Sequence, residues 1–212
     1  MAAQQTRHRA DDAPSAAVDT PPVRAVEGTA PLARPAILVD VDGPLNPFAA
    51  KPERRPRGYA THRLHPRDSP WEHTSRPLRV WLHPQHGRWL LDLAEDTGAE
   101  LVWATTWEHE ANRLLAPILG LPSLPVIDFD GQGQRHHGGH HGKLPAVAEW
   151  AGDRPIAWLD DEFQPLDSSW ARQRTARGAP TLLVQVDPRA GVQPHHLDRI
   201  RRFLRTWESQ QP

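Results

Sequence analysis

The sequence has no cysteine and almost no lysine, since only Lys51 and Lys143 of its 25 basic residues are lysines. The absence of cysteine excludes disulfide bonds and metal sites built from thiolates. No apolar run is long enough for the hydrophobic core of a signal peptide or for a helix that spans a bilayer. We therefore expect a soluble, cytoplasmic protein without membrane contact.

Charge is nearly balanced, with a formal net charge of -1 over 212 residues. This balance argues against a strongly basic surface that coats nucleic acid, and against an acidic tail. Residues 1–33 are rich in Ala, Pro, Asp, Thr and Arg and show no apolar periodicity. We expect these residues to form a disordered leader, followed by a single domain over residues 34–212.

Short apolar segments alternate with helical patterns from residue 36 onward. The apolar segments, which favour strands, are 36–39, 101–104, 126–129, 156–159 and 181–186. Helical spacing follows from Pro84, from Thr105 through Leu115, from about Lys143 to Trp150 and from about Pro194. This alternation predicts an α/β fold with a mainly parallel sheet and helices on both faces.

Two local features refine that expectation. Thr105 and Glu108 have the spacing of a capping box, which predicts the start of a helix at Thr105. Residues 44–83 are crowded with Pro, Arg and His and show no clear period, so they predict a flap or cap inserted after the first strand.

Carboxylates gather where the strands are expected to end. Asp40, Thr105 and Asp160 each follow an apolar segment closely, and the carboxyl ends of parallel strands meet at one edge of a sheet. Asp42 shares a face with Asp40 while the chain stays extended, and Asp161 follows Asp160 directly. An isolated Asp-x-Asp-Gly is explained equally well by a solvated turn. A second carboxylate pair at the same edge favours a Mg²⁺ site, because close like charges need a cation and Mg²⁺ prefers oxygen ligands.

Two further residues suit the chemistry of phosphate. Phosphoryl transfer depends on positioning and charge stabilisation around the phosphate oxygens. Thr105 offers a hydroxyl group, and Lys143, at the start of a predicted helix, offers an ammonium group. The alternative for Lys143 is an ordinary exposed surface lysine.

The segments ILVDVDGPLNP, LVWATTW and IAWLDDEF, together with Lys143, resemble the four successive motifs of the haloacid dehalogenase (HAD) superfamily, in the family order. The resemblance covers about residues 36–187 and implies a Rossmann-like HAD fold. DVDGPLNP, VWATTWEHEAN and WLDDE resemble more narrowly the small HAD-like domains grouped with Swiss-army-knife RNA repair proteins.

The resemblance implies a role for each motif residue. Asp40 would attack phosphorus and form an aspartyl-phosphate, and Asp42 would serve as general acid and base. Thr105 would bind the phosphate, with Thr106 as the alternative, while Lys143 would steady the phosphate and the nucleophile. Mg²⁺ would be held by Asp40, the main-chain carbonyl of Asp42 and the pair Asp160 and Asp161, of which Asp161 is favoured as the direct ligand.

These expectations describe a phosphatase or phosphotransferase. Its substrate would be a phosphomonoester, either a phosphorylated small molecule such as a nucleotide or the end of a nucleic acid. One alternative is a binding module that keeps the HAD fold without turnover, which would predict the loss of a catalytic residue. Another is an RNA-repair accessory protein that binds RNA, against which the near-neutral charge argues. The oligomeric state stays open.

Two weaker signals accompany the motifs. The stretch RHHGGHHGK over 135–143 could bind zinc through His136, His137, His140 and His141, although a flexible surface loop is the favoured interpretation. Most of the nine tryptophans fall in strand or helix patterns and are expected in the core. Trp71 and Trp81, within the insertion, are the candidates for substrate contact.

Overall fold

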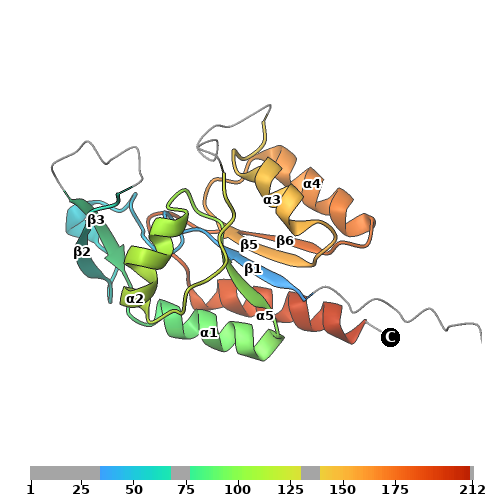
Figure 1. Ribbon diagram of the computed structural model, residues 1–212, viewed down its shortest axis with the longest axis horizontal. Helices are drawn as coiled ribbons and strands as arrows, with labels where there is room; N and C mark the ends of the chain where they lie inside the picture. The colour runs from blue at the N-terminus through green and yellow to red at the C-terminus, as the bar shows by residue number, and fades with distance from the viewer. Residues whose placement is uncertain (1–33, 68–76, 130–138, 211–212) are drawn as a thin grey trace, which may run out of the picture. The chain divides into compact units, whose positions relative to one another are not determined.

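A computed structural model of the chain describes residues 34–67, 77–129 and 139–210. Its centre is a four-stranded parallel sheet with the strand order β4-β1-β5-β6 (Figure 1). These strands are β1 (Ala36–Val39), β4 (Glu100–Trp103), β5 (Ile156–Asp160) and β6 (Thr181–Gln185). The predicted parallel sheet is thus confirmed, with β1 in an inner position between β4 and β5.

Helices cover both faces of the sheet, as the alternation predicted (Figure 1). On one face lie α1 (His86–Thr97) and α5 (Pro194–Ser209). On the other lie α3 (Leu144–Ala151) and α4 (Pro165–Ala176). The sheet is therefore the middle layer of three.

The first strand shows why the sequence builds two cores. Ile37 and Val39 belong to the larger core, which also contains residues of α1 and α5. Ala36 and Leu38 belong to the second core, which contains residues of α3. A parallel strand that is covered on both faces has to be apolar at every position, and this strand is.

A small antiparallel hairpin follows the first strand within the predicted insertion. Its strands are β2 (Ala60–Leu64) and β3 (Leu78–Leu82), and a short helical turn at Pro52–Arg54 precedes them. Leu64, Val80 and Leu82 of the hairpin are buried in the larger core. The hairpin is therefore fastened to the main domain by apolar packing.

The strand predicted at 126–129 is wrong. Only Val126 pairs, in an isolated bridge to Trp103, and no strand forms there. Ile127 and Phe129 are nevertheless buried in the second core. Burial without strand pairing produced the apolar pattern that favoured a strand.

The helix predicted from Thr105 begins later than expected, and the capping box is wrong. Glu108 has φ 45°, a left-handed conformation that cannot continue a helix. Its carboxylate accepts a hydrogen bond from the backbone N–H of Phe129 (3.3 Å). A π-helical turn at Ala111–Leu115 and α2 (Ala116–Leu119) follow.

Helix α4 was not predicted, because its buried positions are not apolar enough to form a stripe. Asp167, Ala171 and Arg174 are its buried residues. Gln164 and Asp167 form a capping box at its start, and Pro165 occupies the first turn. Polar contacts therefore define this helix more than hydrophobic spacing does.

Across the three described ranges, no helix combines the length and apolar character needed to cross a bilayer. The expected leader at 1–33 lies outside these ranges.

Candidate active site

The motif residues meet at the carboxyl edge of the sheet. Asp40 follows β1 directly, and its N–H donates to the carbonyl of Leu159 (3.0 Å). Asp160 is the last residue of β5, and Thr105 lies two residues beyond β4. Because β1 pairs with both β4 and β5, these three residues emerge side by side, as the sequence predicted.

Lys143 is buried between two carboxylates. Its Nζ lies 2.8 Å from Oδ2 of Asp40 and 2.9 Å from Oδ2 of Asp160. Burial alone would lower the pKa of this ammonium, but attraction by Asp160 and Asp40 outweighs it and raises the pKa above its usual value. Lys143 is therefore a charged residue of the site, and the alternative of an exposed surface lysine is wrong.

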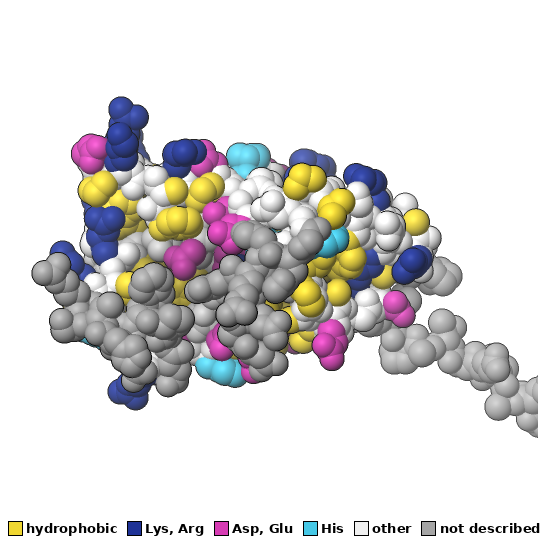
Figure 2. All heavy atoms as spheres, turned by 90° about the horizontal axis from the view of Figure 1, so that it is seen from above, with side chains coloured by type: hydrophobic (Ala, Val, Ile, Leu, Met, Phe, Trp, Pro, Cys, Tyr) yellow, Lys and Arg dark blue, Asp and Glu magenta, His cyan; other side chains and the backbone are white. Residues whose placement is uncertain are grey.

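Three carboxylates form an acidic cluster around this lysine. Asp40, Asp160 and Asp161 each offer an oxygen, and these oxygens lie within 4.8 Å of one another. Figure 2 shows acidic side chains near the middle of one face of the molecule, whereas Asp40 and Asp160 are themselves buried. The cluster joins hard oxygen donors with more negative charge than Lys143 balances, which fits a hard divalent cation.

The three carboxyls have different electrostatic environments. Burial raises the pKa of Asp40 well above its usual value, although Lys143 opposes this effect. Burial raises the pKa of Asp161 to about 7, helped by repulsion from Asp160 and Glu162. For Asp160, burial is outweighed by Lys143 and by a hydrogen bond from His141, so its pKa is lowered and it stays ionised.

Asp42 is not part of this three-carboxylate cluster and is held by two side chains. Its Oδ1 accepts from Nδ2 of Asn46 (2.7 Å), and its Oδ2 accepts from Nε1 of Trp107 (2.8 Å). Asn46 also accepts, through Oδ1, the backbone N–H of Trp81 in β3 (3.0 Å). Neither Asn46 nor Trp107 was foreseen as a site residue, although each lies within four residues of a motif position.

Thr105 and Thr106 both lie in the turn after β4. Thr105 is fully buried, and its hydroxyl accepts from the backbone N–H of Trp107 (3.4 Å). Thr106 is half-buried. Thr105 is the deeper of the two and the nearer to the end of β4, beside the end of β1. The choice between the two threonines stays a prediction.

The His-rich stretch enters the site through one histidine. His141 is fully buried, and its Nε2 lies 3.0 Å from Oδ1 of Asp160. The surface-loop interpretation is therefore wrong for His141, whereas the side chain of His140 is 37% exposed. His136 and His137 lie outside the described residues.

The two tryptophans proposed for substrate contact have different outcomes. Trp71 lies outside the described residues. Trp81 is only 3% exposed and packs in a small core with Ala50 and Tyr59, so the prediction that it contacts substrate is wrong. The aromatic side chain anchors β3 instead.

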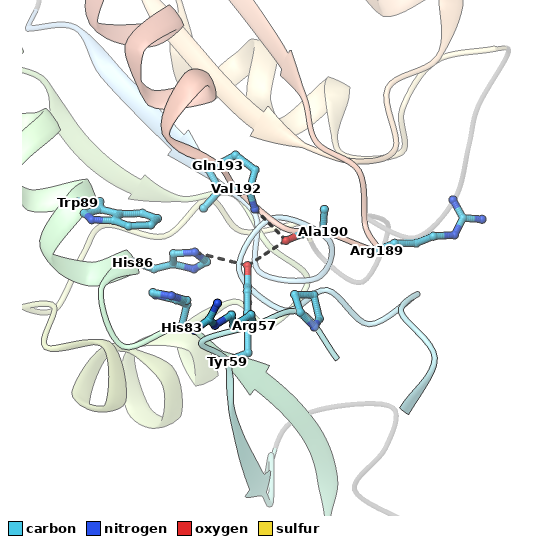
Figure 3. A pocket seen from close by; sticks show the side chains of 10 residues that line it. Arg57, Tyr59, His83, His86, Trp89, Arg189, Ala190, Val192 and Gln193 are labelled. Atoms are coloured by element: carbon cyan, nitrogen blue, oxygen red, sulfur yellow. Dashed lines mark hydrogen bonds between the residues drawn. The ribbon is translucent and has the colours of Figure 1, made fainter. Parts of the chain in front are cut away.

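A separate cavity of about 390 Å³ lies where the hairpin, the start of α1 and the loop before α5 meet (Figure 3). We call it the ring pocket, because His83 stacks on His86 (5.1 Å) and on Trp89 (5.3 Å), while Tyr59 meets both histidines edge-on. Burial lowers the pKa of His86 to about 3. The ring pocket also has Arg57 in its lining and no carboxylate among its lining residues.

A glycine lets the first motif approach the acidic cluster. Gly43 has φ +89°, and a Cβ there would lie 2.3 Å from Cγ of Asp161. Gly43→Ala is therefore expected to displace Asp161 and to weaken binding of a divalent cation at the acidic cluster by about tenfold or more, measured by titration calorimetry. Gly178→Ala is the matched control, because Gly178 has φ +93° but open space around it. Equal loss of affinity in both variants would mean that general destabilisation of the fold, and not the contact with Asp161, is responsible.

Comparison with known proteins supports the same reading of the fold. The profile of the family described as the HAD domain in Swiss Army Knife RNA repair proteins matches residues 36–197. Neither the curated proteins nor the solved structures contain a match to the chain. The matched range includes all four strands of the sheet and every residue of the acidic cluster. The chain belongs to the HAD domain family of Swiss Army Knife RNA repair proteins.

Proposed function

We propose that the protein is a Mg²⁺-dependent phosphatase or phosphotransferase that acts on a phosphomonoester through Asp40. The observation that carries this proposal is the position of Asp40 at the end of β1. There its carboxylate contacts Lys143 at 2.8 Å and has the oxygens of Asp160 and Asp161 within 4.8 Å. A nucleophilic carboxylate beside a fixed cation and further carboxylates suits attack on a phosphate ester.

In the first step an oxygen of Asp40 forms a bond to phosphorus as the bond to the leaving oxygen breaks. Asp42 donates a proton to the leaving group, which makes departure of a poor leaving group feasible. In the second step Asp42 accepts a proton from water, which attacks phosphorus and releases phosphate from Asp40. The hydrogen bonds from Asn46 and Trp107 hold the Asp42 carboxylate in one orientation for both proton transfers.

The remaining site residues bind the phosphate group and neutralise its negative charge. Lys143 stabilises the negative charge of the phosphate and of Asp40, and the Thr105 hydroxyl, or that of Thr106, donates to a phosphate oxygen. Asp40, Asp161 and the main-chain carbonyl of Asp42 would hold Mg²⁺, which supplies charge neutralisation at the phosphate oxygens. Asp160 already accepts from His141, from Lys143 and from the N–H of Glu162 (3.1 Å), which supports Asp161 as the direct ligand.

Basic residues of the hairpin support a polyanionic substrate, namely the phosphorylated end of a nucleic acid. Residues 44–83 contain eight Lys or Arg and three Asp or Glu, whereas the whole chain has a net charge of -1. Arg63 and Arg79 lie directly opposite each other in the hairpin, and both are exposed. Like charges in this position destabilise a strand pair, and a bound anion would relieve that repulsion. Figure 2 shows Lys and Arg side chains at the hairpin end of the molecule, and others toward the opposite end.

The ring pocket supports the same kind of substrate. Aromatic faces stack nucleic-acid bases with little sequence preference. His83 and Trp89 are only half-buried, and Arg57 beside them is exposed. The charge of the hairpin also favours a second candidate function, an RNA-binding accessory role without turnover. All the motif residues that turnover needs are present, so catalysis is the function we propose first.

The two aspartates of the first motif should fail in different ways. Asp40→Asn is expected to lower turnover of every substrate by at least about 10³-fold, because an amide cannot accept the phosphoryl group. Asp42→Asn should retain part of the first step with an activated aryl phosphate but hydrolyse the intermediate slowly. Phosphate should then accumulate on Asp40, detected by intact mass after rapid acid quench. The control is Asp198→Asn, which replaces an exposed carboxylate of α5. Turnover by Asp40→Asn, or a phosphoryl group on another residue, contradicts the proposal.

Mg²⁺ binding should depend on pH through Asp161. Because the pKa of this carboxyl is raised to about 7, it holds a proton below that pH and must release it to bind a cation. Mg²⁺ affinity is therefore expected to fall about tenfold per unit below pH 7 and to level off above it, measured by calorimetry. Asp161→Asn should bind weakly at every pH. An affinity that stays constant across this range in the unsubstituted protein would count against Asp161 as a ligand.

The hairpin arginines should select the substrate. Replacing Arg63 and Arg79 together by glutamine is expected to lower kcat/KM for a 5′- or 3′-phosphorylated oligonucleotide by about tenfold or more, and to flatten its salt dependence. Hydrolysis of a small aryl phosphate should fall far less. The control replaces Arg199 and Arg202, two exposed arginines of α5, by glutamine. Equal losses in the two double variants would show that only overall charge matters.

A further inference from the structure

His141, Lys143 and Asp160 form a closed ring of hydrogen bonds. The backbone N–H of Lys143 donates to Nδ1 of His141 (3.0 Å), and Nε2 of His141 lies 3.0 Å from Oδ1 of Asp160. The side chain of Lys143 returns to the other oxygen of the same carboxylate, with Nζ 2.9 Å from Oδ2. One histidine thus connects the backbone of Lys143 to the carboxylate that holds its ammonium group.

The ring of hydrogen bonds determines which nitrogen of the His141 imidazole carries the hydrogen. A backbone N–H can only donate, so Nδ1 must be the acceptor and cannot carry a proton. Nε2 then carries the hydrogen and donates it to Asp160, which makes His141 a neutral imidazole in one tautomer. Both ring nitrogens are occupied in this arrangement, so neither has a lone pair to offer to zinc.

Packing holds the imidazole in place. The imidazole of His141 lies 5.2 Å from the indole ring of Trp158 and 6.0 Å from the phenyl ring of Phe163, measured between ring centroids. The backbone N–H of His141 donates to both oxygens of Asp167 (3.0 and 3.1 Å). Asp167 is itself fully buried at the start of α4. The orientation of His141 is therefore fixed from the backbone and from the ring faces.

From this geometry we infer that His141 is a positioning residue, which acts through Asp160 to hold the ammonium group of Lys143 against Asp40. A lysine side chain has four rotatable bonds and loses much rotamer freedom when its end is fixed. The ring of hydrogen bonds reduces the entropic cost of fixing the Lys143 side chain during the reaction, because His141 already orients Asp160. The inference rests on the proposed function, since it assigns the ring to phosphoryl transfer at Asp40.

The tautomer can be tested in the unsubstituted protein without any activity. Nitrogen-15 NMR of histidine-labelled protein at neutral pH should show His141 as a neutral ring protonated at Nε2, assigned by the loss of its signals in His141→Phe. A ring protonated at Nδ1, or at both nitrogens, would overturn the inference. This result stands whether or not the protein proves to be a phosphatase.

Substitution tests the link to Lys143. His141→Phe keeps a ring between Trp158 and Phe163 but removes both nitrogens, so kcat with an aryl phosphate is expected to fall about 10- to 100-fold with little change in KM. His141→Gln, whose amide N–H can donate to Asp160, should recover part of that loss. His195→Phe is the control, because His195 is an exposed histidine of α5 and contacts neither Asp160 nor Asp167 in the hydrogen bonds above. Full kcat in a folded His141→Phe protein would overturn the inference.

A double-mutant cycle separates positioning from a general structural effect. If His141 acts through Lys143, His141→Phe should cost little further activity in a Lys143→Ala background. Losses that multiply in the two backgrounds would mean that His141 supports the fold and does not position Lys143. If no variant and no unsubstituted protein hydrolyses any phosphoester, the proposed function fails, and the NMR result alone then decides whether the ring exists.

Discussion

The ion pairs between the buried ammonium of Lys143 and the carboxylates of Asp40 and Asp160 are the interaction on which the rest of the site depends. Burying a charge is costly unless it is paired and hydrogen-bonded, and here each charged group makes the others tolerable. One ammonium cannot balance Asp40, Asp160 and Asp161 together. Burial, helped by this remaining negative charge, raises the pKa of Asp161, and the charge creates a site that suits a cation. The excess of negative charge thus affects both the stability of this edge of the sheet and its capacity to bind a cation.

The hairpin and the first motif are joined through one amide. Asn46 donates to Asp42 and accepts from the backbone of Trp81, so its two ends connect the carboxylate proposed as acid and base to strand β3. A change in the position of the hairpin would therefore reach Asp42 directly. Through Asn46, the strand that carries Arg79 is hydrogen-bonded to the loop that carries Asp42. This connection suits a site whose substrate contacts both the hairpin and Asp42.

The parts of the structure that follow from local chemistry could be predicted from the sequence. Asp40 and Asp160 end apolar strands, and their meeting at one edge follows from the parallel sheet. The partners of Asp42 could not be predicted, because Asn46 and Trp107 approach it only after two separate loops fold. Helix α4 could not be predicted from hydrophobic spacing, because two of its three buried positions are the charged residues Asp167 and Arg174. Trp81 looked available in a polar segment, yet tertiary packing buries it.

Binding of fluoroberyllate tests most directly whether Asp40 accepts the phosphoryl group. Beryllium trifluoride bonds to a carboxylate oxygen and takes the shape of a phosphoryl group, so fluorine-19 NMR can detect the adduct without turnover. Bound-fluoride signals are expected in the unsubstituted protein with Mg²⁺, and none in Asp40→Asn under the same conditions. Signals that persist in Asp40→Asn would contradict this role of Asp40.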